Sequence, residues 1–138
     1  MTMSTMRAVV GAACLVLPSS LMLRAVAAQW SDIGTTSIGN PVSVWAKSVV
    51  KGTDGIITAT VRAVFVKPVK SARGELKASK TVVMVDCGKR TIAVKENTYF
   101  FDARMTRVYE KTAPKIPGFS SPIKGTLPDI ALQQLCKA

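Results

Sequence analysis

The sequence contains no histidine, the side chain that most often acts as a general base near neutral pH. Nucleophiles activated by histidine are therefore excluded, and so is the commonest metal ligand. One catalytic alternative is a thiolate at Cys87 beside the cations Lys89 and Arg90, although no Cys-x-x-Cys spacing supports it. The other is glycoside hydrolysis by paired carboxylates chosen from Asp86, Glu96, Asp102 and Glu110. We expect a protein that is not an enzyme and that binds no cofactor or metal.

Acidic residues are scarce, because 8 Asp and Glu stand against 19 Lys and Arg, which gives a formal net charge of +11. The densest group of cations is opposed only by Glu75 and consists of Lys67, Lys70, Arg73, Lys77 and Lys80. A second group contains Arg104, Arg107, Lys111 and Lys115. Such surfaces attract anionic partners. The alternative is that these charges only keep an exposed loop hydrated.

The candidate partners of this basic surface are lipopolysaccharide, acidic phospholipid at a membrane surface, and sulfated glycans. Nucleic acid is not expected, because aromatic residues do not alternate with the cations. Export, which the beginning of the chain predicts, also disfavours it.

The sequence also has no apolar run of the roughly 20 residues that a membrane-spanning helix needs. Its first apolar run, residues 8–17, follows Arg7 and is ended by Pro18. Small residues follow at Ala25, Ala27 and Ala28. This order is typical of a secretory signal peptide cleaved after Ala28 or Ala27.

We therefore predict a signal peptide over residues 1–28 and one domain over residues 29–138. Cysteine usage agrees, because removing the first segment takes away Cys14 and leaves Cys87 and Cys136 as an even pair. A disulfide between them would contribute about 4 kcal/mol in the chain-entropy model. The alternatives are an uncleaved anchor, a wrongly chosen start codon, a lipid attached to Cys14, or two unpaired buried cysteines.

Alternation of apolar and polar residues predicts that the domain is mostly antiparallel sheet. The clearest strand is Ile56–Val66, which we expect Pro68 to end, so that Lys67–Lys80 becomes a polar connector. Shorter strands are predicted over 30–33, 42–45, 81–86 and 91–96, with a last hairpin around Asp102-Ala103. In the strand over 91–96 we expect Ile92 and Val94 to point inward and Ala93 outward. Tyr99-Phe100-Phe101 is assigned to the sheet core, with an exposed contact patch as the alternative.

The end of the chain predicts a helix. Thr126 is a suitable N-cap, Pro128 is tolerated in a first turn, and Asp129 completes a capping-box spacing. Residues 113–125 contain three prolines and predict an irregular loop. The fold class is therefore α+β, an antiparallel sheet of five to six strands with a C-terminal helix.

The order of several short motifs resembles the bacterial surface-adhesin protein E-like domains. The motifs are Trp30, Ser48-Val49-Val50 before Asp54-Gly55, Val85-Asp86-Cys87 leading into Arg90-Thr91, Tyr99, Pro117-Gly118, and a last helix with Leu135 and Cys136. Two positions depart from the family pattern. Ala46-Lys47 stand where an aspartate is common, and Phe119 only approximately matches the aromatic residue of the late proline loop.

The resemblance implies a helix tied to the sheet by the two cysteines, and residence in the periplasm or on the cell surface of a Gram-negative bacterium. It also implies adhesion to host matrix proteins. Our hypothesis is an exported, non-catalytic envelope binding domain whose contact regions are Lys67–Lys80 and Lys111–Lys124. The alternative is a periplasmic structural or accessory protein that docks on an envelope complex and has no soluble ligand.

Overall fold

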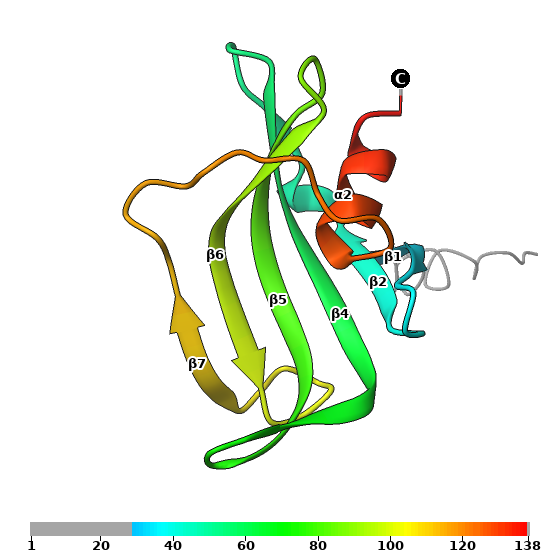
Figure 1. Cartoon of the computed structure of the whole chain (residues 1–138), viewed down its shortest axis with the longest axis vertical. Coiled ribbons are helices and arrows are strands. Elements are labelled where there is room, and N and C mark those ends of the chain that lie inside the picture. The colour runs from blue at the N-terminus through cyan, green and yellow to red at the C-terminus, as the bar shows by residue number, and fades with distance from the viewer. Residues whose placement is uncertain (1–28, 138) are drawn as a thin grey trace, which may run out of the picture.

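A computed structural model of the protein describes residues 29–137 (Figure 1). The predicted signal peptide and the alternative of a lipid on Cys14 lie outside the described residues. Within them, no helix is both long and apolar enough to cross a membrane.

The described chain forms one antiparallel sheet and one α-helix (Figure 1). Six of the seven strands lie in the order β1-β2-β4-β5-β6-β7, and the seventh, β3, pairs with β4 beside this path. The elements are β1 (Trp30–Thr35), β2 (Pro41–Trp45), the 3-10 helix η1 (Ala46–Ser48), β3 (Val50–Lys51), β4 (Ile56–Ser71), β5 (Gly74–Asp86), β6 (Thr91–Phe100), β7 (Val108–Thr112) and α2 (Leu127–Leu135). The prediction of five to six strands was too low, because β3 has two residues and is too short to show an alternating pattern.

The prediction of a connector over Lys67–Lys80 was wrong, because β4 and β5 continue through it as one long hairpin. Pro68 does interrupt the ladder, and pairing breaks between Val64 and Val69. The Val66 amide there donates instead to the side-chain oxygen of Asn40, 2.9 Å away. Pairing then resumes up to the turn, because the partner strand stabilises a segment whose lysines alone favour a loop.

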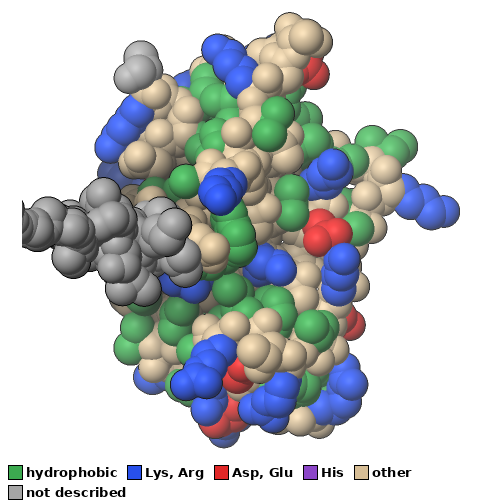
Figure 2. Space-filling view, turned by 180° about the vertical axis from the view of Figure 1, so that it is seen from behind, with side chains coloured by type: hydrophobic (Ala, Val, Ile, Leu, Met, Phe, Trp, Pro, Cys, Tyr) green, Lys and Arg blue, Asp and Glu red, His purple; other side chains and the backbone are tan. Residues whose placement is uncertain are grey.

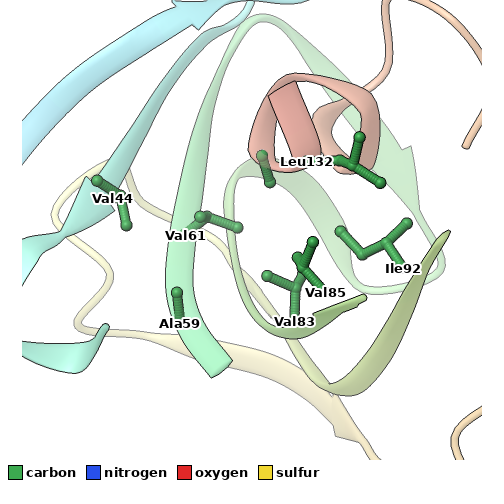
Figure 3. Packing of buried hydrophobic residues seen from close by; sticks show 8 residues of the cluster. Val44, Ala59, Val61, Val83, Val85, Ile92 and Leu132 are labelled. Carbon is green, nitrogen blue, oxygen red and sulfur yellow. The ribbon is translucent and has the colours of Figure 1, made fainter. Parts of the chain in front are cut away.

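Helix α2 packs on one face of the sheet, which we call the helix face (Figure 3). Leu132 is only 2% exposed and lies in the same cluster as Val61, Val83 and Ile92. The valines come from neighbouring strands, since Ala59, two residues before Val61, is the partner of Val83. The single helix therefore closes the core over strands β2, β4, β5 and β6.

The start of α2 differs from the predicted capping box. Thr126 has the extended backbone of an N-cap, but its hydroxyl donates to the carbonyl of Ile123 at 2.6 Å. The Asp129 carboxylate accepts from the Gly125 amide at 2.9 Å, one residue earlier than a capping box requires. The carboxylate still lies in the first turn, where the helix dipole favours negative charge.

The predicted disulfide is present. Cys87, in the turn after β5, is bonded to Cys136 at the end of α2, with a Cα–Cα distance of 5.4 Å. The bond fixes the last turn of the helix to the end of the β5–β6 hairpin. The side chain of Arg90 adds a hydrogen bond of 2.9 Å to Gln133.

The face opposite α2, which we call the open face, also has buried residues. Ala93 was predicted to point outward into solvent but is only 2% exposed. It lies opposite Met84, and a bulge beside Val83 leaves Lys95 out of the ladder. A sheet that packs side chains on both faces does not show a simple apolar-polar alternation.

Candidate binding site

The structure divides the five predicted basic residues among three places on the β4–β5 hairpin. Lys67 and Lys70 lie exposed on the last part of β4. Arg73 and Lys77 line a pocket at the hairpin tip. Lys80 lies further along β5 on the open face, opposite Arg62. Figure 2 shows many Lys and Arg side chains at the end of the molecule where this hairpin turns.

The tip pocket is a hollow of about 270 Å³ between two hairpins. Its lining residues are Arg73, Gly74, Glu75, Lys77, Phe101 and Arg107. The β4–β5 hairpin supplies the first four, and the turn between β6 and β7 supplies the other two. Three cations therefore meet one carboxylate around an aromatic side chain.

An aromatic pair holds the arginines of the tip pocket in place. The rings of Phe101 and Tyr109 meet edge to face, with their centres 5.5 Å apart. The guanidinium of Arg73 lies 4.6 Å from the Tyr109 ring centre, and that of Arg107 lies 5.9 Å from the Phe101 ring centre. Arg73 also donates a hydrogen bond of 2.7 Å to the carbonyl oxygen of Tyr109. Stacking on aromatic faces suits the flat guanidinium group and limits its freedom before a ligand binds.

Asp102 shapes the turn that carries Arg107. Its carboxylate accepts hydrogen bonds from the Thr106 hydroxyl at 2.6 Å, from the Thr106 amide at 3.0 Å and from the Arg107 amide at 2.9 Å. These bonds, the one from the Thr106 hydroxyl foremost, lower the pKa of Asp102 below its ordinary value of 3.8. At neutral pH the ionised carboxylate therefore fixes the backbone from which Arg107 projects.

The charge of the tip pocket is not neutralised by ion pairs. Among residues 29–137 the ion pair found is between Lys111 and Glu96, at 3.3 Å, and it involves no lining residue of the pocket. Three cations, of which Arg73 and Arg107 lie on aromatic rings, can bind a sulfate, phosphate or carboxylate group through charge-assisted hydrogen bonds. The pocket has the chemistry of an anion-binding site.

The sequence did not reveal that Arg107, Phe101 and Tyr109 belong with Arg73. Arg107 was placed in a separate basic group, and Phe101 was assigned to the core together with Phe100. In the structure Phe100 is buried, whereas Phe101 forms a wall of the pocket. The sequence could have distinguished Phe100 from Phe101, because neighbouring side chains in a strand point to opposite faces of the sheet.

A larger hollow lies on the helix face, beside the start of α2. Its main part has a volume of about 640 Å³ and runs between β6 and the loop over 114–123. Two smaller parts, of about 370 and 270 Å³, continue it over β5 and β4 and share Ser79, Tyr99 and Leu127. None of the residues that line these three parts is charged. The hollow therefore lacks the charged groups that would hold an anion.

The second predicted contact region, Lys111–Lys124, begins at the end of β7 and continues as an extended loop (Figure 1). Two of its apolar side chains are strongly exposed, Ile116 at 87% and Ile123 at 77%. Ser120 connects the loop to the sheet through two backbone hydrogen bonds with Ile92. The loop thus presents apolar side chains next to lysines at the surface.

The catalytic alternatives gain no support from the structure. Cys87 is in the disulfide and is therefore not a thiolate nucleophile. Of the four candidate carboxylates, Asp86 accepts a hydrogen bond from the Lys89 amide, Glu96 is paired with Lys111, and Asp102 organises its turn. Glu110 lies across from Tyr99 in the β6–β7 ladder.

Comparison with known proteins identifies the fold. No protein-family model and no curated protein matches the chain. A crystal form of Haemophilus influenzae protein E superposes with a TM-score of 0.55 at 11% sequence identity, over 79% of this chain and 87% of that chain. A second structure of Haemophilus influenzae protein E superposes with a TM-score of 0.54 at 10% sequence identity, over 79% of this chain and 84% of that chain. The structure of protein E from non-typeable Haemophilus influenzae superposes with a TM-score of 0.53 at 10% sequence identity, over 79% of this chain and 76% of that chain. The chain therefore has a protein E-like fold, as the short motifs predicted.

Proposed function

We propose that the protein is an exported, non-catalytic binding protein of the bacterial cell envelope, and that it belongs to the protein E-like adhesins. The protein E-like fold supports this proposal, as does the disulfide, which is typical of oxidising compartments outside the cytoplasm. The leader-like residues 1–28 are consistent with export. The protein is then a periplasmic or surface protein of a Gram-negative cell.

The tip pocket is the proposed contact site, and its ligand is an anionic group on a sulfated glycan of the host matrix. The convergence of Arg73, Lys77 and Arg107 carries this proposal, because no ion pair formed within residues 29–137 offsets their charge. Sulfate groups spaced along a glycan can engage the pocket together with the exposed Lys67 and Lys70 on the same hairpin. Lipopolysaccharide offers phosphate groups to the same cations and is the competing ligand.

Binding to immobilised heparin tests this proposal. The test variant replaces Arg73, Lys77 and Arg107 by glutamine. The matched control replaces Lys47, Lys51 and Lys89, which are exposed residues of η1, β3 and the β5–β6 turn, and removes the same charge. Loss of roughly tenfold or more in affinity in the test variant alone supports the pocket. Equal losses in both variants would mean that only net charge matters, and the pocket proposal would fail.

The exposed Ile116 and Ile123 favour a second function, docking on an envelope complex without a soluble ligand. Exposed apolar side chains on a projecting loop are typical of protein contacts. Protease added to intact cells separates the two functions. An adhesin on the surface is cleaved, whereas a periplasmic accessory protein is cleaved only after the outer membrane has been opened.

A further inference from the structure

Two cations lie side by side on the open face of the sheet, on the side opposite α2. Arg62 of β4 and Lys80 of β5 are direct partners in the antiparallel ladder. Such partners have their Cβ atoms about 4.5–5.5 Å apart, so the two charged side chains leave the sheet together. Figure 2, seen from behind, shows Lys and Arg side chains across the middle of this face, with apolar side chains between them.

Both cations are held by aromatic rings and not by carboxylates. The guanidinium of Arg62 lies 4.5 Å from the ring centre of Trp30, and the ammonium group of Lys80 lies 5.8 Å from that of Phe100. The ion pair found among residues 29–137 involves neither cation. The Nε–H group of Arg62 is buried and has no hydrogen-bond partner within the described chain.

The nearest carboxylate in this row of the sheet does not neutralise the pair. Asp32 of β1 is the ladder partner of Ser43, and Ser43 in turn is the partner of Arg62. The Ser43 hydroxyl donates to Asp32 at 2.9 Å, so the carboxylate is engaged one strand away from Arg62. Lys80 lies one strand further from Asp32.

Folding alone does not account for this arrangement. Like charges directly opposite each other in a ladder destabilise a sheet, and both side chains are half-buried, which weakens the screening of their repulsion by water. A buried donor without a partner adds a further penalty. A bound anion would offset the repulsion, because it would neutralise the two charges.

We propose that Arg62 and Lys80 form a second anion-binding site, separate from the tip pocket, that takes one tetrahedral oxyanion, a phosphate or a sulfate group. The fork of Arg62 supplies directed donors and Lys80 supplies a compact charge. The group can come from a lipid headgroup or from a sulfated sugar. The site does not depend on the tip pocket, since Arg73 and Lys77 belong to the hairpin tip beyond it.

The tryptophans make this site directly observable. The chain has two, Trp30 and Trp45, and their rings are in contact with centres 5.1 Å apart. Because Trp30 carries the Arg62 guanidinium, intrinsic fluorescence reports on an anion at this site. The lining residues of the tip pocket include no tryptophan.

The experiment titrates the purified protein, produced from the full chain, with inorganic phosphate at an ionic strength kept constant with chloride. We expect a saturable change in tryptophan emission. Lys80→Gln keeps the Arg62–Trp30 contact and should weaken phosphate binding about tenfold, the loss of one charge-assisted contact. The matched control Lys95→Gln, an exposed residue of β6, should bind as the parent does.

A change in emission that does not saturate, or one that Lys80→Gln leaves unaltered, would overturn the proposal. The triple variant of the tip pocket should keep the full response, which separates failure of this site from failure of the proposed function. Vesicles of phosphatidylglycerol and a sulfated disaccharide, titrated in parallel, identify the source of the anion. Whichever binds more tightly than free phosphate is the source.

Discussion

Arg73 and Tyr109 join the two hairpins of the tip pocket. The Arg73 guanidinium donates to the Tyr109 carbonyl at 2.7 Å and lies 4.6 Å from the centre of the same residue's ring. The two residues are 36 positions apart, so the contact connects the β4–β5 turn with β7. A guanidinium has five N–H donors, and one backbone acceptor leaves several of them for a ligand. Arg73 is thus held in place and still able to bind an anion.

Replacing Tyr109 by leucine tests whether the aromatic ring positions Arg73 for binding, because the charge of Arg73 is retained. Tyr109→Leu removes a cation–π contact of about 0.5–1 kcal/mol, so we expect binding to heparin to weaken about two- to fivefold. The dependence of affinity on salt should stay unchanged, because the number of ionic contacts is the same. In Arg73→Gln both the affinity and the salt dependence should fall. Dissociation constants at several NaCl concentrations measure both, and a reduced salt dependence in Tyr109→Leu would contradict this role.

The hydroxyl of Thr106 is the main cause of the lowered pKa of Asp102. We expect Thr106→Val to raise that pKa toward its ordinary value of 3.8, because the carboxylate loses its hydrogen bond of 2.6 Å. Carboxyl carbon chemical shifts, followed as a function of pH, measure the change. Thr53→Val, in the exposed β3–β4 turn, is the control and should leave Asp102 unaffected.

The same lowered pKa fixes the sign of a pH effect on stability. The stabilising contribution of ionised Asp102 is fully present above its ordinary pKa of 3.8 and is lost as the pH falls through the lower folded value. We therefore expect the β6–β7 turn to loosen in acid. Amide hydrogen exchange of Thr106 and Arg107, whose N–H groups donate to Asp102, should accelerate relative to β5. Exchange that keeps pace with β5 would show that Asp102 does not hold the turn.

Local patterns predicted most of the elements but not how far they extend. The alternation over Ile56–Val66 identified β4, and the residues after Thr126 identified α2. The lysines between Lys67 and Lys80 resemble a solvated loop, because nothing local shows that two polar segments pair with each other. Each segment is a strand only in the presence of the other.

The candidate sites could not be predicted for a related reason. The tip pocket needs Arg73 beside Arg107, and the open-face site needs Arg62 beside Lys80. Both arrangements depend on the pairing register of strands that are distant in the sequence. A register shift of one residue would move the side chains of a strand to the opposite face of the sheet. The disulfide could be predicted without knowing how the strands pair, because removal of the predicted signal peptide leaves only two cysteines.

Removing the disulfide should destabilise the protein by about 4 kcal/mol, since it joins residues 49 positions apart. The test is the paired variant Cys87→Ser and Cys136→Ser, unfolded with urea. Hydrogen exchange should rise more in α2 than in β4, because the bond fixes the end of the helix. Reducing the disulfide of the parent protein should reproduce the variant, and equal stability before and after reduction would contradict the prediction.

Alanine variants of Gly125 and Gly39 distinguish two costs of adding a side chain near the start of α2, namely backbone strain and steric crowding. Both have positive φ, +82° and +91°, so alanine at either should be disfavoured by about 1–2 kcal/mol. At Gly125 an added Cβ would also lie 2.9 Å from Cβ of Ser37, whereas at Gly39 nothing lies within 4 Å. We expect Gly125→Ala to be the more destabilising by about 1–3 kcal/mol, the usual range for overpacking.

The additional loss of stability in Gly125→Ala, relative to Gly39→Ala, should depend on the Ser37 side chain. A double-mutant cycle, followed by urea unfolding, measures this dependence. Ser37→Gly removes the crowded side chain while leaving its amide, which donates to the Gly125 carbonyl at 2.9 Å. In that background Gly125→Ala should lose about as much stability as Gly39→Ala does in the parent, because only the backbone strain remains. If the loss at Gly125 is the same with and without the Ser37 side chain, crowding is not its cause. The approach of the β1–β2 turn to the start of α2 would then tolerate a larger residue than the structure indicates.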